Sequence, residues 1–118
     1  FDNTELKNEG DYSVTLITGI VNYNLLVEHL KKLGRKVNLV KYPDHHNYST
    51  KDINDILLAY KRDKNTKKLI LTTEKDATKI RKFDMKFKGL KVYFVPIEVI
   101  FSNKKTFEKQ ILEYVKEN

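Results

Sequence analysis

Short strand-like segments alternate with helix-like segments along this chain, and this alternation constrains its fold more than any other feature. Runs rich in apolar and β-branched residues cover residues 14–20, 36–42, 67–73 and 90–101. Apolar residues recur at helical spacing in residues 22–34, 50–63, 74–83 and 105–118. Repeated strand–helix units predict a layered α/β fold: a mostly parallel, Rossmann-like sheet of four or five strands with helices on both faces.

The 118 residues suffice for one domain with a single core. Residues 1–12 are polar and contain a Gly-Asp turn signal, so they are interpreted as a lead-in or linker before one α/β domain over residues 13–118. The chain starts at Phe1 and its one methionine is Met85, which leads us to expect a portion of a longer protein. No apolar run reaches the roughly 20 residues of a membrane span.

Helix ends and buried stripes can be predicted from particular residues. Ser49 or Thr50 is the expected N-cap of the second helix, with Asp52 in its first turn. Thr73 and Asp76 form an acidic variant of the capping box at the start of the third helix. The predicted inward-facing residues of the first two helices are Leu25, Leu26, His29, Leu30, Leu33, Ile53, Ile56, Leu57 and Tyr60.

Unusual polar residues gather in three loops that follow strands: residues 19–22, 43–49 and 72–76. In parallel sheets the carboxyl ends of the strands share one edge, where ligands commonly bind. We therefore expect these loops to meet and to form the functional site.

The second loop contains Asp44, His45 and His46 in succession. A histidine beside a carboxylate can hold or share a proton near neutral pH, because the carboxylate fixes its tautomer. The same tripeptide also fits an ordinary surface turn in which Asp44 bonds to nearby backbone. A metal site is disfavoured, because one loop seldom supplies three ligands and no second His/Asp cluster occurs.

The first and third loops have two readings each. Thr73 and Lys75, with free backbone N–H groups at a helix start, could contact a phosphate, or they could simply cap the helix and face solvent. Asn22 could likewise contact a ligand or serve only as an N-cap. The sequence has no G-x-x-x-x-G-K-[ST] phosphate loop, no G-x-G-x-x-G fingerprint and no cysteine.

The formal charge of +7 comes from 23 Lys and Arg against 16 Asp and Glu. Such a charge favours anionic partners, although lysines scattered among acids also fit a generally lysine-rich composition. The cluster of Lys31, Lys32 and Arg35 is one candidate basic surface.

Taken in order, "ITGIVNYNLLVEHLKKLG", "YPDHHNYSTKDI", "LILTTEKDATKI" and "VYFVPIEVIF" with "ILEYVKEN" resemble the carboxyl-terminal domain of the tetraacyldisaccharide 4'-kinase family. The resemblance covers residues 13–118. It implies ATP- and Mg²⁺-dependent phosphorylation of the 4'-hydroxyl of an anionic lipid, the tetraacyldisaccharide 1-phosphate precursor of lipid A. The expected setting is the cytoplasmic face of the bacterial inner membrane, with no nucleic-acid partner.

The resemblance also implies roles for particular residues. The phosphate loop would belong to an amino-terminal domain, and His45 would pair with that domain's catalytic aspartate, with Asp44 as a second active-site carboxylate. His46 and Asn22, with Thr73, Lys75 and Asp76 of the Thr-Glu-Lys-Asp segment, are expected to contact substrate or line the interface. The role of that segment could also be purely structural. The family often has Gly and Pro where this chain has Val21 and Tyr23, which argues against close phosphate approach there.

Two other functions fit parts of the sequence. One is a DHH-type metal-dependent phosphoesterase, which would need further aspartates at other strand ends. The other is a basic nucleic-acid-binding module that uses Tyr23, Tyr42 and Tyr48 for stacking.

Overall fold

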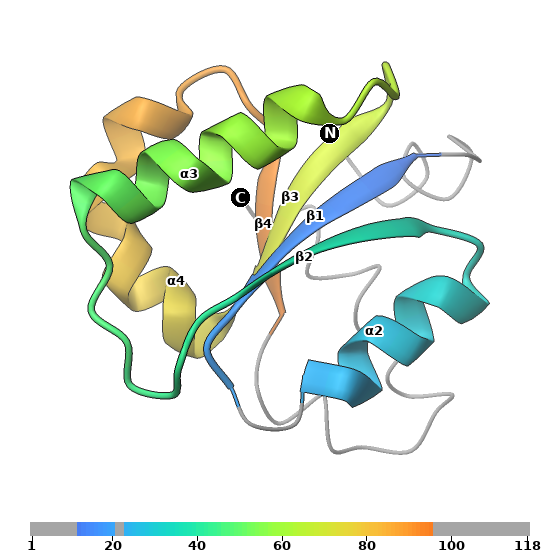
Figure 1. Cartoon of the computed structure of the whole chain (residues 1–118), viewed down its shortest axis with the longest axis horizontal. Coiled ribbons are helices and arrows are strands. Elements are labelled where there is room, and N and C mark those ends of the chain that lie inside the picture. The colour runs from blue at the N-terminus through green and yellow to red at the C-terminus, as the bar shows by residue number, and fades with distance from the viewer. Residues whose placement is uncertain (1–11, 21–22, 96–118) are drawn as a thin grey trace.

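The computed structural model describes residues 12–20 and 23–95 of the chain (Figure 1). Within them, one sheet is formed by β1 (Ser13–Thr18), β2 (Lys36–Lys41), β3 (Lys68–Thr73) and β4 (Val92–Val95). The helical elements are α2 (Tyr23–Lys32), α3 (Thr50–Arg62), α4 (Glu74–Ile80) and the 3₁₀ helix η1 (Arg81–Phe87). The predicted alternation of strands and helices is confirmed.

The strand order is β2-β1-β3-β4, and every neighbouring pair is parallel. The chain goes from β1 outward to β2, then crosses back to β3 on the other side of β1. The loops after β1 and β3 therefore leave the sheet in opposite directions. A parallel sheet places its ligand crevice at such a switch point, beyond the carboxyl ends of the strands.

Helices cover both faces of the sheet, as predicted (Figure 1). On one face, α2 contributes Leu26 and Leu30 to a core that also contains Val14, Leu16, Leu69, Leu71 and Tyr93. On the other face, α3 and α4 contribute Ile53, Ile56 and Ile80 to a core that also contains Ile17 and Ile70. Alternate residues of β1 and β3 thus face opposite layers, and the two central strands are buried on both sides.

A complete capping box begins α3. The Ser49 hydroxyl accepts the Asp52 N–H at 3.2 Å, and the Asp52 carboxylate accepts the Ser49 N–H at 2.9 Å. These two bonds satisfy donors that the first turn of a helix leaves unpaired. The expected N-cap at Ser49 is confirmed.

Two expectations about the helices are wrong. The helix predicted over residues 74–83 ends as α-helix at Ile80 and continues as η1, with non-helical backbone angles at Phe83. Leu25, expected in the buried stripe of its helix, is 41% exposed. Spacing alone placed Leu25 inward, whereas the face of α2 that contacts the sheet centres on Leu26 and Leu30.

Asp63, just after α3, connects β1, β2 and the loop before β3 near the amino-terminal ends of these strands. Its carboxylate accepts hydrogen bonds from the Ser13 hydroxyl, from Asn38 Nδ2 at 3.1 Å and from the Asn65 N–H at 3.1 Å. Lys36 Nζ lies 3.9 Å away. Burial by itself would raise the pKa of Asp63, but these donors and charges outweigh it, and the pKa lies below its usual range.

Several predictions fall outside the described residues. These are most of the lead-in, Asn22, the part of the last strand-like run beyond Val95, and the closing amphipathic helix. Tyr12, at the end of the predicted lead-in, is buried in the α2-side core beneath the Arg35 guanidinium. No helix in the described part of the chain is long and apolar enough to cross a membrane.

Candidate functional site

Three loops meet at the carboxyl edge of the sheet, as the sequence predicts. Gly19, just after β1, donates its N–H to Asp76 Oδ2 at 3.1 Å. Tyr48, in the loop after β2, donates its hydroxyl to Asp76 Oδ1 at 2.9 Å. Asp76 lies in the first turn of α4, after β3, so one carboxylate joins all three loops.

Asp76 is 4% exposed and lies where the loops after β1 and β3 diverge. Besides Gly19 and Tyr48, it accepts the Thr73 hydroxyl at 2.6 Å, while Thr73 Oγ1 accepts the Asp76 N–H at 3.2 Å. Thr73 therefore caps α4 as predicted, but the Asp76 carboxylate reaches across the sheet edge. The Asp76 carboxylate thus lies at the start of α4, where Thr73 and Lys75 are the predicted phosphate contacts. A negatively charged side chain there disfavours phosphate binding.

Gly19 permits a close approach between the first two loops. A Cβ at this position would lie 2.9 Å from the Pro43 carbonyl oxygen and 3.1 Å from Asp76 Oδ1. Only a glycine lets the Pro43 backbone rest against the end of β1 at this distance.

The Pro43 carbonyl begins a tight turn that presents His45. It accepts the His46 N–H at 3.2 Å, and His45 has a φ of 62°. A bond from the first to the fourth residue with positive φ at the third is the pattern of a type II turn, which usually has Gly or Asn at the third position. His45 therefore adopts a backbone conformation that is uncommon for residues other than glycine.

The His45 side chain is 79% exposed, and its Nε2 lies 3.4 Å from Asp44 Oδ2. Asp44 also accepts the His45 N–H at 3.1 Å and forms an ion pair with Lys75 Nζ at 2.5 Å. The hydrogen bond from Lys75 is the main reason that the pKa of Asp44 lies below its usual range. Asp44 thus faces His45 as a carboxylate whose position is set by a lysine of α4.

His46 points the other way and belongs to the packing beneath the turn. Its ring stacks on Tyr42 with centroids 4.6 Å apart and meets the Tyr48 ring edge-on at 4.9 Å. His46 Nε2 lies 2.8 Å from Asp52 Oδ2, and Lys79 Nζ donates to the His46 carbonyl at 2.9 Å. The two adjacent histidines therefore differ in environment. The His45 ring faces solvent, whereas the His46 ring packs on Tyr42 and contacts Asp52.

The phenols beneath the turn are perturbed by the same surroundings. Burial, followed by the Asp76 charge, raises the pKa of Tyr48 far above its usual range. Burial, followed by the Asp52 charge, raises the pKa of Tyr42 to about 12. Both phenols stay protonated at neutral pH, so Tyr48 remains a hydrogen-bond donor to Asp76.

Sequence reasoning missed three residues of this site. The sequence suggests only base stacking for Tyr48 and only a place in a helix start for Asp52. It suggests no role for Lys79. Their contacts join residues that are 28, 6 and 33 positions apart. An aromatic residue inside an otherwise polar loop was the one available signal for Tyr48.

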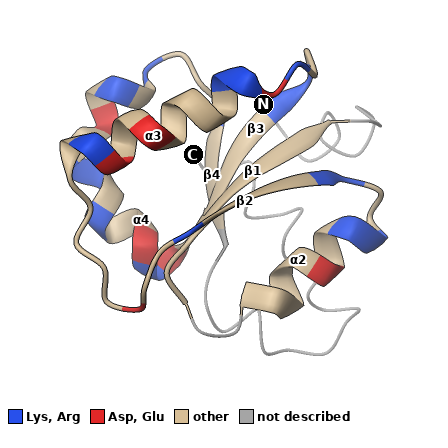
Figure 2. Ribbon diagram, in the orientation of Figure 1, with Lys and Arg blue, Asp and Glu red and all other residues tan. Residues whose placement is uncertain are grey.

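Lys and Arg residues occur on several elements and are interspersed with Asp and Glu residues on α3 and α4 (Figure 2). Among the described residues, no three His, Asp or Glu side chains come together as metal ligands. What the turn offers is therefore an accessible imidazole next to an oriented carboxylate. This pair can accept or share a proton with a group brought to the edge of the sheet.

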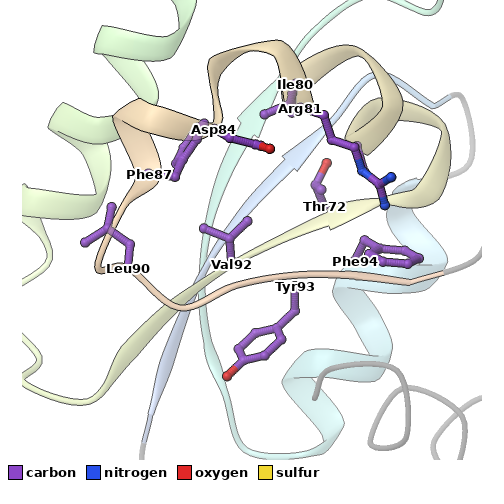
Figure 3. A pocket seen from close by; sticks show the side chains of 10 residues that line it. Thr72, Ile80, Arg81, Asp84, Phe87, Leu90, Val92, Tyr93 and Phe94 are labelled. Atoms are coloured by element: carbon purple, nitrogen blue, oxygen red, sulfur yellow. The ribbon is translucent and has the colours of Figure 1, made fainter. Parts of the chain in front are cut away.

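A separate pocket of about 300 Å³ lies between the α4–η1 segment and β4 (Figure 3). It is lined mainly by apolar side chains, including Ile80, Phe87 and Val92, with Arg81 and Asp84 as its charged members. Thr72, from the predicted loop 72–76, lines this pocket, whereas Asp44, His45 and His46 do not.

The comparisons with known proteins point to one family. The model of the family described as tetraacyldisaccharide-1-P 4'-kinase (LpxK) matches residues 1–116. A tetraacyldisaccharide 4'-kinase from Bacteroides fragilis is 37% identical over 109 residues, which are 89% of this chain and 29% of that protein. The enzyme of the same name from Legionella pneumophila (strain Lens) is 35% identical over 92 residues, which are 78% of this chain and 24% of that protein.

This chain therefore spans less than a third of the length of these relatives. No solved structure matches it at a significant level. Because the family model covers nearly the whole sequence, the chain belongs to the tetraacyldisaccharide-1-P 4'-kinase family.

Proposed function

We propose that this chain is the carboxyl-terminal domain of a longer kinase that transfers the γ-phosphoryl group of ATP to the 4'-hydroxyl of a tetraacyldisaccharide 1-phosphate. Family membership supports the reaction class, and the relatives' greater length leaves room for a second domain. The sequence lacks a phosphate loop, so ATP would be bound mainly by that other domain.

The observation that carries the proposed role is the exposed His45 ring on its left-handed turn. Phosphoryl transfer depends mainly on positioning and charge neutralisation, with a carboxylate accepting the proton of the attacking hydroxyl. His45 would hydrogen-bond to such a carboxylate on the partner domain and share that proton. Asp44, adjacent to His45 and held by Lys75, would help to orient the imidazole.

The acids around His45 do not fit a Mg²⁺ site. Asp44 is paired with Lys75, and Asp76 is buried under three donors from the protein. The metal that accompanies ATP would therefore be held by the other domain. The excess of lysines would favour the anionic lipid and the anionic cytoplasmic face of the inner membrane, at about 1 kcal/mol per basic residue near the surface.

Neither alternative function gains support from the structure. A DHH-type phosphoesterase needs a cluster of metal ligands, and the described residues contain none. Base stacking by Tyr48 is excluded by its burial, since only 2% of the residue is exposed. Tyr42 is covered by the His46 ring.

The test is a transfer assay with the full-length protein, γ-labelled ATP and tetraacyldisaccharide 1-phosphate. We expect label in the lipid product. An acceptor that already carries a 4'-phosphate is the matched control and should remain unlabelled. Equal labelling of both acceptors, or of neither, would contradict the proposal.

A further inference from the structure

The loop that carries His45 is attached to α4 at three points, all from the first two turns of that helix. Lys75 pairs with Asp44, Asp76 accepts the Tyr48 hydroxyl, and Lys79 donates to the His46 carbonyl at 2.9 Å. One contact is made by the residue before His45, and two are made by residues after it. The Pro-Asp-His-His loop and the Thr-Glu-Lys-Asp segment are thus one structural unit.

These three attachments differ in burial. The Lys75–Asp44 pair lies at the surface, with side chains 33% and 36% exposed, where an ion pair contributes little to stability. The Tyr48–Asp76 bond joins residues that are 2% and 4% exposed. A buried hydrogen bond to a charged group is stronger, and loss of one partner leaves the other unsatisfied.

The buried bond continues to the turn through packed rings. Tyr48 contacts the Tyr42 ring at 5.0 Å and the His46 ring at 4.9 Å, and His46 stacks on Tyr42. On the other side, Asp76 accepts the Gly19 N–H, and Gly19 leaves room for the adjacent Pro43 carbonyl that begins the turn. Asp76 is therefore connected to both ends of the turn, although it does not contact His45.

We infer that Asp76 and Tyr48 are positioning residues for His45: their buried hydrogen bond fixes the turn in the conformation that presents the imidazole to the partner domain. This inference rests on the proposed function of His45. It also assigns Asp76 a role different from the expected contact with substrate or interface, because its carboxylate is enclosed by Gly19, Tyr48 and Thr73.

The test uses Tyr48→Phe in the full-length enzyme, which removes one hydroxyl and keeps the ring stack. Its matched control is Tyr60→Phe, which removes the hydroxyl that donates to the Lys68 carbonyl at 3.4 Å, away from the turn. Asp76→Asn is compared in the same way with Asp63→Asn, because both are buried aspartates that join loops and strands.

We expect Tyr48→Phe and Asp76→Asn to lower kcat roughly 10- to 100-fold, since misplacing a catalytic group by about 1 Å has effects of that order. KM should stay within roughly twofold, because substrate binding is not altered. Both control variants should keep kcat within roughly twofold of the wild type at a temperature where all variants are folded.

A double-mutant cycle with His45→Gly separates positioning from general damage. If Tyr48 acts through His45, then Tyr48→Phe causes no further loss of kcat in the His45→Gly enzyme. The inference is overturned if Tyr48→Phe keeps wild-type kcat, or if its loss is equally large without His45. If His45→Gly itself keeps full kcat, the proposed role of His45 fails, and the inference fails with it. Should Asp76→Asn not fold, the Tyr48 cycle still decides.

Discussion

At the scale of single residues, the site depends on two positions where the backbone would normally favour glycine. Gly19 is a glycine, and its missing side chain leaves room for the Pro43 carbonyl. His45 is not a glycine, although its φ of 62° lies in the left-handed region. A left-handed backbone at an exposed histidine is an uncommon arrangement, and it is consistent with the role proposed for this imidazole.

Replacing Gly19 by Ala should destabilise this chain by roughly 1–3 kcal/mol, because the new methyl group overlaps a backbone carbonyl that the His46 N–H holds in place. Urea unfolding measures this loss. In the full-length enzyme the variant should also lower kcat, since the displaced carbonyl begins the His45 turn.

Gly34→Ala is the matched control. Gly34 has a φ of +80°, but nothing lies within 4 Å of a Cβ placed there. This variant should cost roughly 1–2 kcal/mol through backbone conformation alone and leave kcat unchanged. A Gly19→Ala protein with wild-type stability and activity would show that the close approach has no role.

At the scale of elements, the first turn of α3 does two things at once. Asp52 Oδ2 accepts the Ser49 N–H at 2.9 Å and is hydrogen-bonded to the His46 ring, whose Nε2 lies 2.8 Å away. The Ser49 N–H, and then His46, hold the pKa of Asp52 below its usual range. Helix capping and loop anchoring are thus served by the same carboxylate.

Substituting Ser49 by Ala should lower the free energy of unfolding by about 1 kcal/mol, the usual cost of losing an N-cap side chain. Chemical denaturation of this chain checks it. Thr50→Ala, at the adjacent exposed position, should change stability by less than about 0.5 kcal/mol. Equal effects of the two substitutions would mean that the capping box adds nothing.

At the scale of the whole molecule, two buried aspartates form hydrogen bonds at opposite ends of the strands of one sheet. Asp63 binds Ser13 of β1, Asn38 of β2 and Asn65 in the loop before β3, near the amino-terminal ends of these strands. Asp76 joins the loops after β1, β2 and β3 at the carboxyl-terminal ends. Asp63 stabilises the fold at the end of the sheet away from His45. Asp76 lies at the carboxyl-terminal end, where the His45 turn also lies.

Asp63 should make stability depend on acid pH. Its pKa is lowered in the folded state, so its contribution is complete above the unfolded-state pKa of about 3.9 and is lost as pH falls through the folded pKa. Asp63→Asn should therefore reduce the difference in unfolding free energy between pH 7 and pH 2. An unchanged difference would show that Asp63 is not an acid-sensitive link.

Local patterns were sufficient to predict the α/β class, the two-sided sheet, the Ser49 cap and the meeting of three loops. They were not sufficient for Asp76, because its capping position gives no sign of bonds to Gly19 and Tyr48, which are 57 and 28 residues away. The different orientations of His45 and His46 were also hidden, since they depend on the turn bond and on Asp52. The exposure of Leu25 shows that the spacing of apolar residues predicts a buried stripe on a helix but not which residues lie at the centre of that stripe.

The most direct test of the account is kcat of the full-length enzyme carrying His45→Gly. Glycine is compatible with the left-handed turn, so this substitution removes the imidazole without straining the loop. The account predicts a fall in kcat of roughly 10²- to 10⁴-fold, with folding stability maintained. A glycine enzyme that transfers phosphate at the wild-type rate would contradict it.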